Sequence, residues 1–411
     1  MATIHPFKAL RPNPEVVSEV ASLPYDVMNS HEAREMAKNN HFSFLHVVRP
    51  EINLSEGVDL YSEEVYQAGA NAMRNLIAKK ALIREKNPSL YVYQQEWRGH
   101  VQTGLVAGTS AQEYNENKIK KHEFTREKKE NDRLKHVRTL NANTGPVFLA
   151  YRSRQEVDFL LMKITKEKPV YDFTGDDEIS HRLWVVSDEE MIKKLQQAFK
   201  DVPALYVADG HHRSASGAKV AGIRAQANPC HTGDEEYNYF LSVIFPHNQL
   251  KILDYNRVVK DLGSMNTDAF IAKIKEKFNI SSTENPKPDK PKKIGMYTGG
   301  RWYYLEPKKG TYPENDPVDS LDVAILQNNL LSEILGIEDP RKDERIAFVG
   351  GIRGVRELEM MVDKGWAVAF SMYPTSMKEL MEIADSGRTM PPKSTWFEPK
   401  LRSGLIIHSL D

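Results

Sequence analysis

The chain has 411 residues, of which 40% are hydrophobic and 27% charged, the composition of a soluble globular protein of roughly two or three domains. The 56 Lys and Arg residues balance the 57 Asp and Glu residues, which argues against a protein that coats nucleic acid or membrane through net charge. Cys230 is the only cysteine, so an intramolecular disulfide and a cysteine-based zinc or iron-sulfur site are excluded.

Neither a secretory leader nor a run of about 18 apolar residues is visible in the sequence. We therefore expect a cytoplasmic protein that binds neither nucleic acid nor a membrane. The sequence carries no signal for its oligomeric state.

The N-terminal part carries signals for both helices and strands. Asn29, followed three residues later by Glu32, forms the capping-box pattern that starts a helix, which we expect to run to about Lys38. Alternation and helical periodicity predict three further elements: a strand over 41–48, a helix over Ser62–Lys80, and a hairpin over 90–114 that turns at Arg98-Gly99.

The clearest boundary is Asn285–Lys293, where three prolines and four lysines predict an extended linker. Beyond it, Ile294–Pro307 predicts a hairpin around Gly299-Gly300. A helix is expected over Leu321–Leu335, ended by Gly336, and a strand, a helix and a strand follow over 345–372.

These signals predict an α+β (mixed α/β) fold. The predicted organisation has four segments: an N-terminal α/β segment over 1–85, a core over 86–284, the linker over 285–293 and a C-terminal α/β part over 294–411.

The most informative stretch is Ala204–Ala221, in which a buried strand is followed by Gly210 and by a helix. Such a junction points free N–H groups and the positive end of a helix dipole at one place, where phosphate binds well. The side chains of His211, His212 and Arg213 add donors, and Arg213 can grip a phosphate with two hydrogen bonds. Asp209 can orient a histidine or help to hold Mg²⁺. The alternative is a glycine turn with exposed histidines.

The sequence DGHHR, between an apolar strand and a small-residue helix, resembles the corresponding box of the ParB and sulfiredoxin-like superfamily, and most closely the D-G-H-[HT]-R box of its free serine kinases. Over nearly its whole length the chain looks like the bacterial domain-of-unknown-function family ten-fifteen, with LPYDV, HExT, ADGHHR and MPPKSTWFEPK as recurrent blocks. The resemblance implies a ParB/serine-kinase-like core whose residues Gly210 to Arg213 cradle nucleotide phosphates.

Two departures from the relatives matter. Sulfiredoxins use a cysteine in the box, whereas His211 stands here, so that thiolate chemistry is excluded. ParB proteins continue into a helix-turn-helix region, which is not found after the box.

The second block is the basic run 117–143, which by composition is a solvated helix face. Free serine kinases carry an early His-Glu pair whose Glu is the general base on the serine hydroxyl. By that resemblance Glu123 is the predicted base, with His122 beside it and Thr125 near the phosphates. Arg133 is expected to neutralise the transferred phosphate, and Asp132 either assists a metal or pairs with Lys128 or Lys135.

Glu32 is the rival base, although its capping-box role explains it adequately. Spacing does not decide between Glu32 and Glu123, because both lie far before His211 in the sequence. Either choice implies structure inserted between the base and the box.

Other candidates have a functional and a structural interpretation each. Tyr25-Asp26 forms either a rigid turn or part of a site. Arg49, expected at a strand end, recognises a substrate carboxylate or forms an ion pair with Glu51. His181, expected just before a strand, donates to phosphate or is an ordinary edge histidine.

Near the C-terminus, the block Met390–Lys400 combines prolines with polar side chains. Lys393, Ser394 and Thr395 bind a nucleotide phosphate, or the block is a structural loop docked by Trp396 and Phe397. In the first case the C-terminal part folds back on the phosphate site.

Together these residues predict an enzyme that uses ATP or ADP with Mg²⁺ to phosphorylate a small hydroxylated metabolite, free L-serine being the first candidate, or that runs the reverse reaction. Two alternatives stay open: a non-catalytic nucleotide-binding switch or scaffold, and a phosphohydrolase of a phosphorylated metabolite such as phosphoserine.

Overall fold

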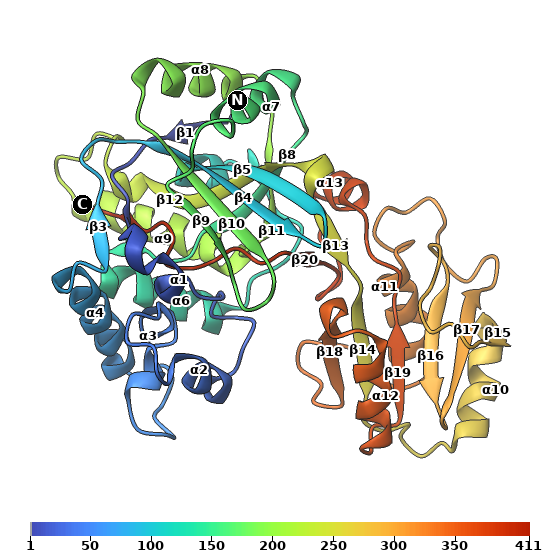
Figure 1. Cartoon of the computed structure of the whole chain (residues 1–411). Helices are drawn as coiled ribbons and strands as arrows, with labels where there is room; N and C mark the ends of the chain where they lie inside the picture. The colour runs from blue at the N-terminus through green and yellow to red at the C-terminus, as the bar shows by residue number, and fades with distance from the viewer. Residues whose placement is uncertain (1) are drawn as a thin grey trace. The chain divides into compact units, whose positions relative to one another are not determined.

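The computed structural model describes residues 2–411, which form two compact units (Figure 1). The first unit comprises 1–121, 125–250 and 399–411, and the second comprises 122–124 and 251–398. Both contain sheets covered by helices, so the predicted α+β class is confirmed.

A nine-stranded mixed sheet forms the centre of the first unit, in the order β6-β11-β8-β12-β5-β4-β10-β9, with β1 also paired to β5. The β11–β6 and β12–β8 pairs are parallel, and the other pairs are antiparallel. Its strands are β1 (Ile4–His5), β4 (Leu90–Trp97), β5 (His100–Ser110), β6 (Ile119–Lys120), β8 (Val147–Tyr151), β9 (Tyr171–Thr174), β10 (Ser180–Val186), β11 (Leu205–Asp209) and β12 (Tyr239–Pro246). Two small sheets pair β2 (Leu10–Pro12) with β3 (Leu82–Arg84) and β7 (Ala142–Asn143) with β21 (His408–Ser409).

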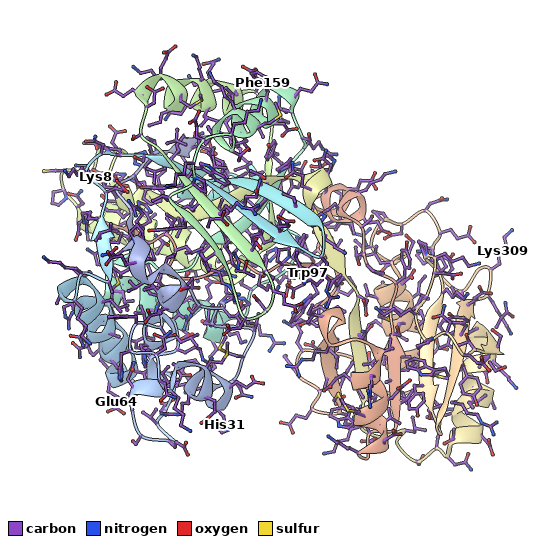
Figure 2. The ribbon with its side chains drawn as sticks, viewed as in Figure 1. Lys8, His31, Glu64, Trp97, Phe159 and Lys309 are labelled. Carbon is purple, nitrogen blue, oxygen red and sulfur yellow. The ribbon has the colours of Figure 1, made fainter. Side chains whose placement is uncertain are left out.

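The helices of the first unit bury apolar faces against these sheets. They are α1 (Val17–Val20), α2 (Ser30–Ala37), α3 (Leu45–Val48), α4 (Glu63–Ala78), α5 (Ala111–Asn115), α6 (Glu127–Leu140), α7 (Gln155–Ile164), α8 (Glu189–Lys200) and α9 (His211–Ala227), with 3₁₀ turns at Pro14–Val16, Pro50–Asn53, Glu236–Asn238 and His247–Gln249. In α8, Asp188 caps the first turn, and Ile192, Leu195 and Phe199 are buried at helical spacing. Each such side chain contributes about 1.5–3 kcal/mol through burial. In α7, by contrast, one large apolar side chain faces the solvent: Phe159 is 60% exposed (Figure 2).

The second unit contains a six-stranded sheet in the order β15-β17-β16-β19-β14-β18, all of whose pairs are antiparallel. Its strands are β14 (Tyr255–Val259), β15 (Phe278–Ser282), β16 (Ile294–Thr298), β17 (Arg301–Pro307), β18 (Ile346–Gly350) and β19 (Val368–Ser371), and a separate pair joins β13 (Lys251–Leu253) to β20 (Trp396–Glu398). The helices are α10 (Thr267–Lys277), α11 (Asp322–Leu326), which continues into the π-helical η5 (Gln327–Ser332), α12 (Val355–Asp363) and α13 (Met377–Asp385), with a 3₁₀ turn at Gly351–Arg353. Among the described residues, no helix has the length and apolarity needed to cross a bilayer.

Most of the predicted elements are present. Asn29 and Glu32 form both hydrogen bonds of the capping box at α2. Both predicted hairpins are two-residue turns with positive φ at each turn residue, at Arg98-Gly99 and at Gly299-Gly300. The predicted helix over Leu321–Leu335 is found as α11 and η5, followed by Gly336 at φ +67°.

The strand predicted over 41–48 is wrong, because this run contains the short helix α3. Leu45 and Val48, three residues apart, belong to one core cluster with Met73 and Leu76 of α4. In so short an apolar run, alternation and helical spacing cannot be told apart.

The boundary at Asn285–Lys293 also differs from the prediction. This segment lies inside the second unit, where it forms most of the loop between β15 and β16. The carbonyl of Pro286 lies so close to Gly295 that a Cβ there would meet it at 2.5 Å, and the N–H of Lys292 donates hydrogen bonds to Asp322. Proline and lysine content therefore marks an extended loop here, and the chain passes to the second unit earlier, at residue 251.

The segment 399–411 belongs to the first unit, although it follows the whole of the second in the sequence. Residues 401–410 are all buried. The segment pairs with Ser22 and Leu10 through isolated bridges and with β7 through β21, so it is an integral part of the first unit.

Candidate functional site

The junction between β11 and α9 has the predicted geometry. Gly210 lies between the two elements at φ +94°, a conformation that favours glycine, and it is the N-cap of α9. No side-chain hydrogen bond caps this helix of 17 residues. The uncapped first turn is the arrangement in which backbone N–H groups and the helix dipole attract an anion.

Arg213, in the first turn of α9, folds back over Gly210. A Cβ atom at Gly210 would lie 3.2 Å from Nε and 3.3 Å from Cζ of Arg213, so glycine leaves the room that the guanidinium occupies. One terminal nitrogen donates to the carbonyl of Pro146, and another lies 3.8 Å from Asp26. Nε is buried and has no hydrogen-bond partner among the described residues.

Asp209 ends β11 and is engaged by two protein donors. Oδ1 accepts from the N–H of Gly210 at 2.8 Å, and Oδ2 accepts from Nζ of Lys400 at 3.0 Å. Burial favours the neutral acid, but the Lys400 ammonium and the Arg213 guanidinium outweigh it and hold the pKa of Asp209 well below its usual range. Asp209 is therefore ionised and orients the turn.

The two histidines of the box differ in their surroundings. His211 is buried, and burial, opposed by the nearby Asp209 carboxylate, lowers its pKa to about 4, so it is neutral at pH 7. The ring of His212 accepts a hydrogen bond at Nε2 from the backbone N–H of Arg126 at 3.0 Å, which ties the start of α6 to the start of α9.

Arg133 on α6 belongs to a second buried cluster. Its guanidinium donates two hydrogen bonds to Oδ2 of Asp132, at 2.7 and 2.9 Å, and its Cζ lies 4.1 Å from the ring centroid of Tyr25. Oδ1 of Asp132 accepts from the hydroxyl of Tyr66 at 2.9 Å. Burial raises the pKa of Tyr25 to about 12, so this ring is a neutral phenol.

The two carboxylates predicted to help hold Mg²⁺ are both hydrogen-bonded to protein donors. Both oxygens of Asp209 and both oxygens of Asp132 accept hydrogen bonds, so these carboxylates position Lys400 and Arg133. Their role as Mg²⁺ ligands stays a prediction.

Two small cavities in the first unit share a wall. The smaller cavity, of about 30 Å³, we call the arginine cavity. Its lining includes Tyr25, Arg133, His136, Thr144, Arg213 and Ser216. The larger, of about 90 Å³, shares Tyr25, Arg133 and His136 with it and adds Arg49 and Glu51. Cationic side chains from three separate parts of the sequence therefore surround one small region.

Arg49 and His181 both contact other protein side chains. Arg49 follows the helix α3 rather than a strand, and it pairs with Glu51 at 2.9 Å. His181 lies within β10 rather than before it. Its Nδ1 faces the hydroxyl of Tyr93 at 2.7 Å, and its Nε2 accepts from Arg402 at 3.2 Å, so both ring nitrogens are engaged by protein groups.

The remaining predicted residues are divided between the units. Thr125, in the first unit, donates to Glu130 at 2.6 Å. His122 and Glu123 belong to the second unit, where the carbonyl of His122 accepts from the N–H of Met390.

The three C-terminal candidates also lie in the second unit. The carbonyl of Lys393 accepts from Arg257 at 3.0 Å, the hydroxyl of Ser394 donates to Pro391 at 2.6 Å, and the hydroxyl of Thr395 lies 3.5 Å from Nε2 of His122. Lys400, the last residue of the same block, is the lysine that reaches the box.

Three features of the site were not assigned from the sequence. His136 lines both cavities, Lys400 pairs with Asp209, and Tyr25-Asp26 provides contacts to both Arg133 and Arg213. The turn predicted at this dipeptide is present, since Val27 N–H bonds to the carbonyl of Pro24. The only sequence signal at this dipeptide is the turn that Pro24 favours, and that signal does not link Tyr25-Asp26 to the box.

Comparison with known proteins identifies the family. Residues 4–324 match the family described as "Protein of unknown function (DUF1015)". The chain belongs to the DUF1015 family. The matched residues include Tyr25, Arg133 and the box, whereas the block that ends at Lys400 lies beyond them. No curated protein sequence matches this DUF1015 protein.

Solved structures show a distant likeness. A conserved hypothetical protein from Pyrococcus furiosus shares 13% identity at a TM-score of 0.36, covering 74% of this chain and 95% of that one. A free serine kinase variant in complex with ADP shares 14% identity at a TM-score of 0.37, covering 74% and 92%. SbnI from Staphylococcus aureus, truncated at its C-terminus, shares 13% identity at a TM-score of 0.37, covering 72% and 85%.

Proposed function

We propose that this DUF1015 protein is a nucleotide-dependent phosphotransferase that acts on a small hydroxylated metabolite, with free L-serine as the first acceptor to test. The observation that carries the proposal is the junction at Gly210, where an uncapped helix start and the Arg213 guanidinium lie together. Phosphate groups bind to such junctions because N–H dipoles and a cation act on the same oxygens.

In this proposal the acceptor hydroxyl attacks the terminal phosphorus of ATP, an O–P bond forms, and the bond to the ADP oxygen breaks. The first turn of α9 and Arg213 hold the phosphates, and Glu123 takes the hydroxyl proton, a role that rests on the family resemblance. Glu32 is less suited, because its carboxylate accepts the N–H of Asn29 in the capping box at 2.8 Å. A reaction that consumes ATP belongs in the cytoplasm, where ATP is supplied.

Phosphorus NMR tests the proposal directly. The full chain is incubated with magnesium, ATP or ADP, and a pool of amino acids and small alcohols. We expect a new phosphomonoester signal, reduced at least 100-fold in Arg213→Ala and retained in Arg182→Ala. Arg182 pairs with Glu96 and Asp172 on the sheet and is the matched control. Removing a positioned phosphate ligand has effects of about this size.

The other outcomes separate the alternatives. Release of inorganic phosphate from added phosphoserine, with no ester formed from the nucleotide, would identify a phosphohydrolase. Nucleotide binding with neither product would identify a switch or scaffold. If Glu123→Gln kept full turnover while Glu32→Gln abolished it, the assignment of the base would be wrong.

A further inference from the structure

The arginine cavity has the features of a binding site beside the start of α9, because Arg213 from the first turn of that helix is part of its lining. At about 30 Å³ it has room for roughly two water-sized groups, and the adjoining cavity of about 90 Å³ adds room for several more. Both are far below the roughly 300 Å³ or more that drug-sized ligands occupy. A nucleoside does not fit here, whereas a small acid group does.

Two buried nitrogens in the lining have no partner among the described residues. They are Nδ1 of His136, whose side chain is 2% exposed, and Nε of Arg213. The other ring nitrogen of His136 lies 3.3 Å from the hydroxyl of Thr144, which fixes the ring in place. More than nine in ten buried polar groups in proteins are hydrogen-bonded, so two orphans around one cavity indicate a missing partner.

The charges of the lining favour an anion as that partner. Arg133 and Arg213 are both buried, with side chains 12% and 11% exposed. Arg133 pairs with Asp132, whereas Arg213 lies 3.8 Å from Asp26, beyond hydrogen-bond distance, and interacts with Asp209 through charge alone. Burial and the Arg133 charge lower the pKa of His136 far below its usual value, so this ring is neutral and Nδ1 can face an anion only as a donor. A buried guanidinium that is incompletely paired is stabilised by an anion at the same place.

We propose that the arginine cavity binds the acid group, a carboxylate or a phosphomonoester, of a small metabolite through Arg133 and His136, with Arg213 shared between this group and the nucleotide phosphates. The larger cavity gives room for the remainder of that metabolite. The place of this ligand as acceptor or product rests on the proposed function, whereas its binding does not. The proposal thus narrows the acceptor class to small hydroxy acids.

Calorimetric titration of the full chain tests the site without turnover. The probes are inorganic phosphate, L-serine, and L-serinamide, which keeps the hydroxyl and the amine but lacks the carboxylate. We expect phosphate and L-serine to bind the unmodified protein and L-serinamide to bind at least tenfold more weakly. Arg133→Met should weaken both anions at least tenfold, while Arg182→Met changes neither.

A second variant distinguishes the loss of anion binding from the loss of the folded structure. Arg133→Lys keeps the charge but loses the planar fork, and it should weaken the anions by a smaller factor with an unchanged circular dichroism spectrum. ADP, titrated into the same variants, should keep its affinity within threefold. That result separates the role of Arg133 from nucleotide binding.

Three results would overturn the inference: equal binding of L-serine and L-serinamide, undiminished anion binding in both Arg133 variants, or no binding of either anion at 10 mM, which would mean that ordered water alone fills the cavity. If the acids bind while ADP does not, the inference stands and the proposed function fails.

Discussion

The two units treat buried charge in opposite ways. The first unit buries Arg133, Arg213 and several histidines beside cavities and a helix start, and these groups come from distant parts of the sequence. In the second unit, Asp322 is buried at the start of α11 and pairs with Lys292 of a neighbouring loop. We infer from this difference that buried charged side chains that line a cavity indicate a bound ligand. A buried ion pair between a helix and a loop, by contrast, indicates a structural role.

Two buried groups, one in each unit, should respond to acid in opposite directions. In the first unit, burial lowers the pKa of His211 to about 4, so the unfolded chain binds more protons between pH 6.5 and 4 and stability falls as the pH falls. The shift corresponds to roughly 3 kcal/mol for this residue alone. His136, His181 and His408 are shifted in the same direction by burial.

In the second unit, burial raises the pKa of Asp322 to about 6, so the folded state binds the extra proton and stability rises as the pH falls from 6 toward 3.8. Hydrogen exchange between pH 7.5 and 4.5 should show lost protection in 205–227 and retained protection in 294–307. Asp322→Asn should remove the gain in the second unit only. Simultaneous loss of protection in both units would contradict the comparison.

Gly210→Ala should test how strictly the box depends on its backbone. A residue with a Cβ at φ +94° costs about 1–2 kcal/mol, and that Cβ would meet the Arg213 guanidinium. We expect a lower melting temperature together with weaker nucleotide binding. The control is Gly222→Ala in the same helix, where nothing lies within 4 Å and alanine should stabilise by about 0.5–1 kcal/mol. Equal effects of the two variants would mean that Gly210 is only a helix position.

The two hairpin turns, one in each unit, should show the smallest change in the free energy of unfolding. Gly299→Asn in the second unit should stabilise by about 0.5 kcal/mol, because Asn-Gly is favoured in two-residue turns with positive φ and restricts the unfolded chain. The same change at Arg98 in the first unit should gain less, since the guanidinium there lies 4.9 Å from the Trp97 ring centroid. Chemical denaturation measures both. A larger gain at Arg98 would show that its ring contact contributes nothing.

The elements that could be predicted from the sequence differ from those that could not in whether neighbouring or distant residues determine them. Local patterns predicted individual elements of the second unit, because Gly299-Gly300, Gly336 and the alternating strands act through neighbours in the chain. They did not predict the limits of that unit, which depend on tertiary contacts. The junction at Gly210 was predicted for the same reason. The grouping of Tyr25 with Arg133 was not, because it depends on tertiary packing between a turn and a helix about a hundred residues apart. The strand expected over 41–48 was wrong because the apolar run is too short to separate alternation from helical spacing, and its last four residues form α3.

The segment 399–411 has a consequence for the order of events during synthesis. It leaves the ribosome after every residue of the second unit, yet it supplies Lys400 to the box and a strand to the first unit. Every residue of the second unit is therefore synthesised before Lys400, the partner of Asp209 in the box. A chain cut between residues 398 and 400 would contain the whole second unit, yet its Asp209 would lack the Lys400 ammonium and its first unit would lack the strand β21.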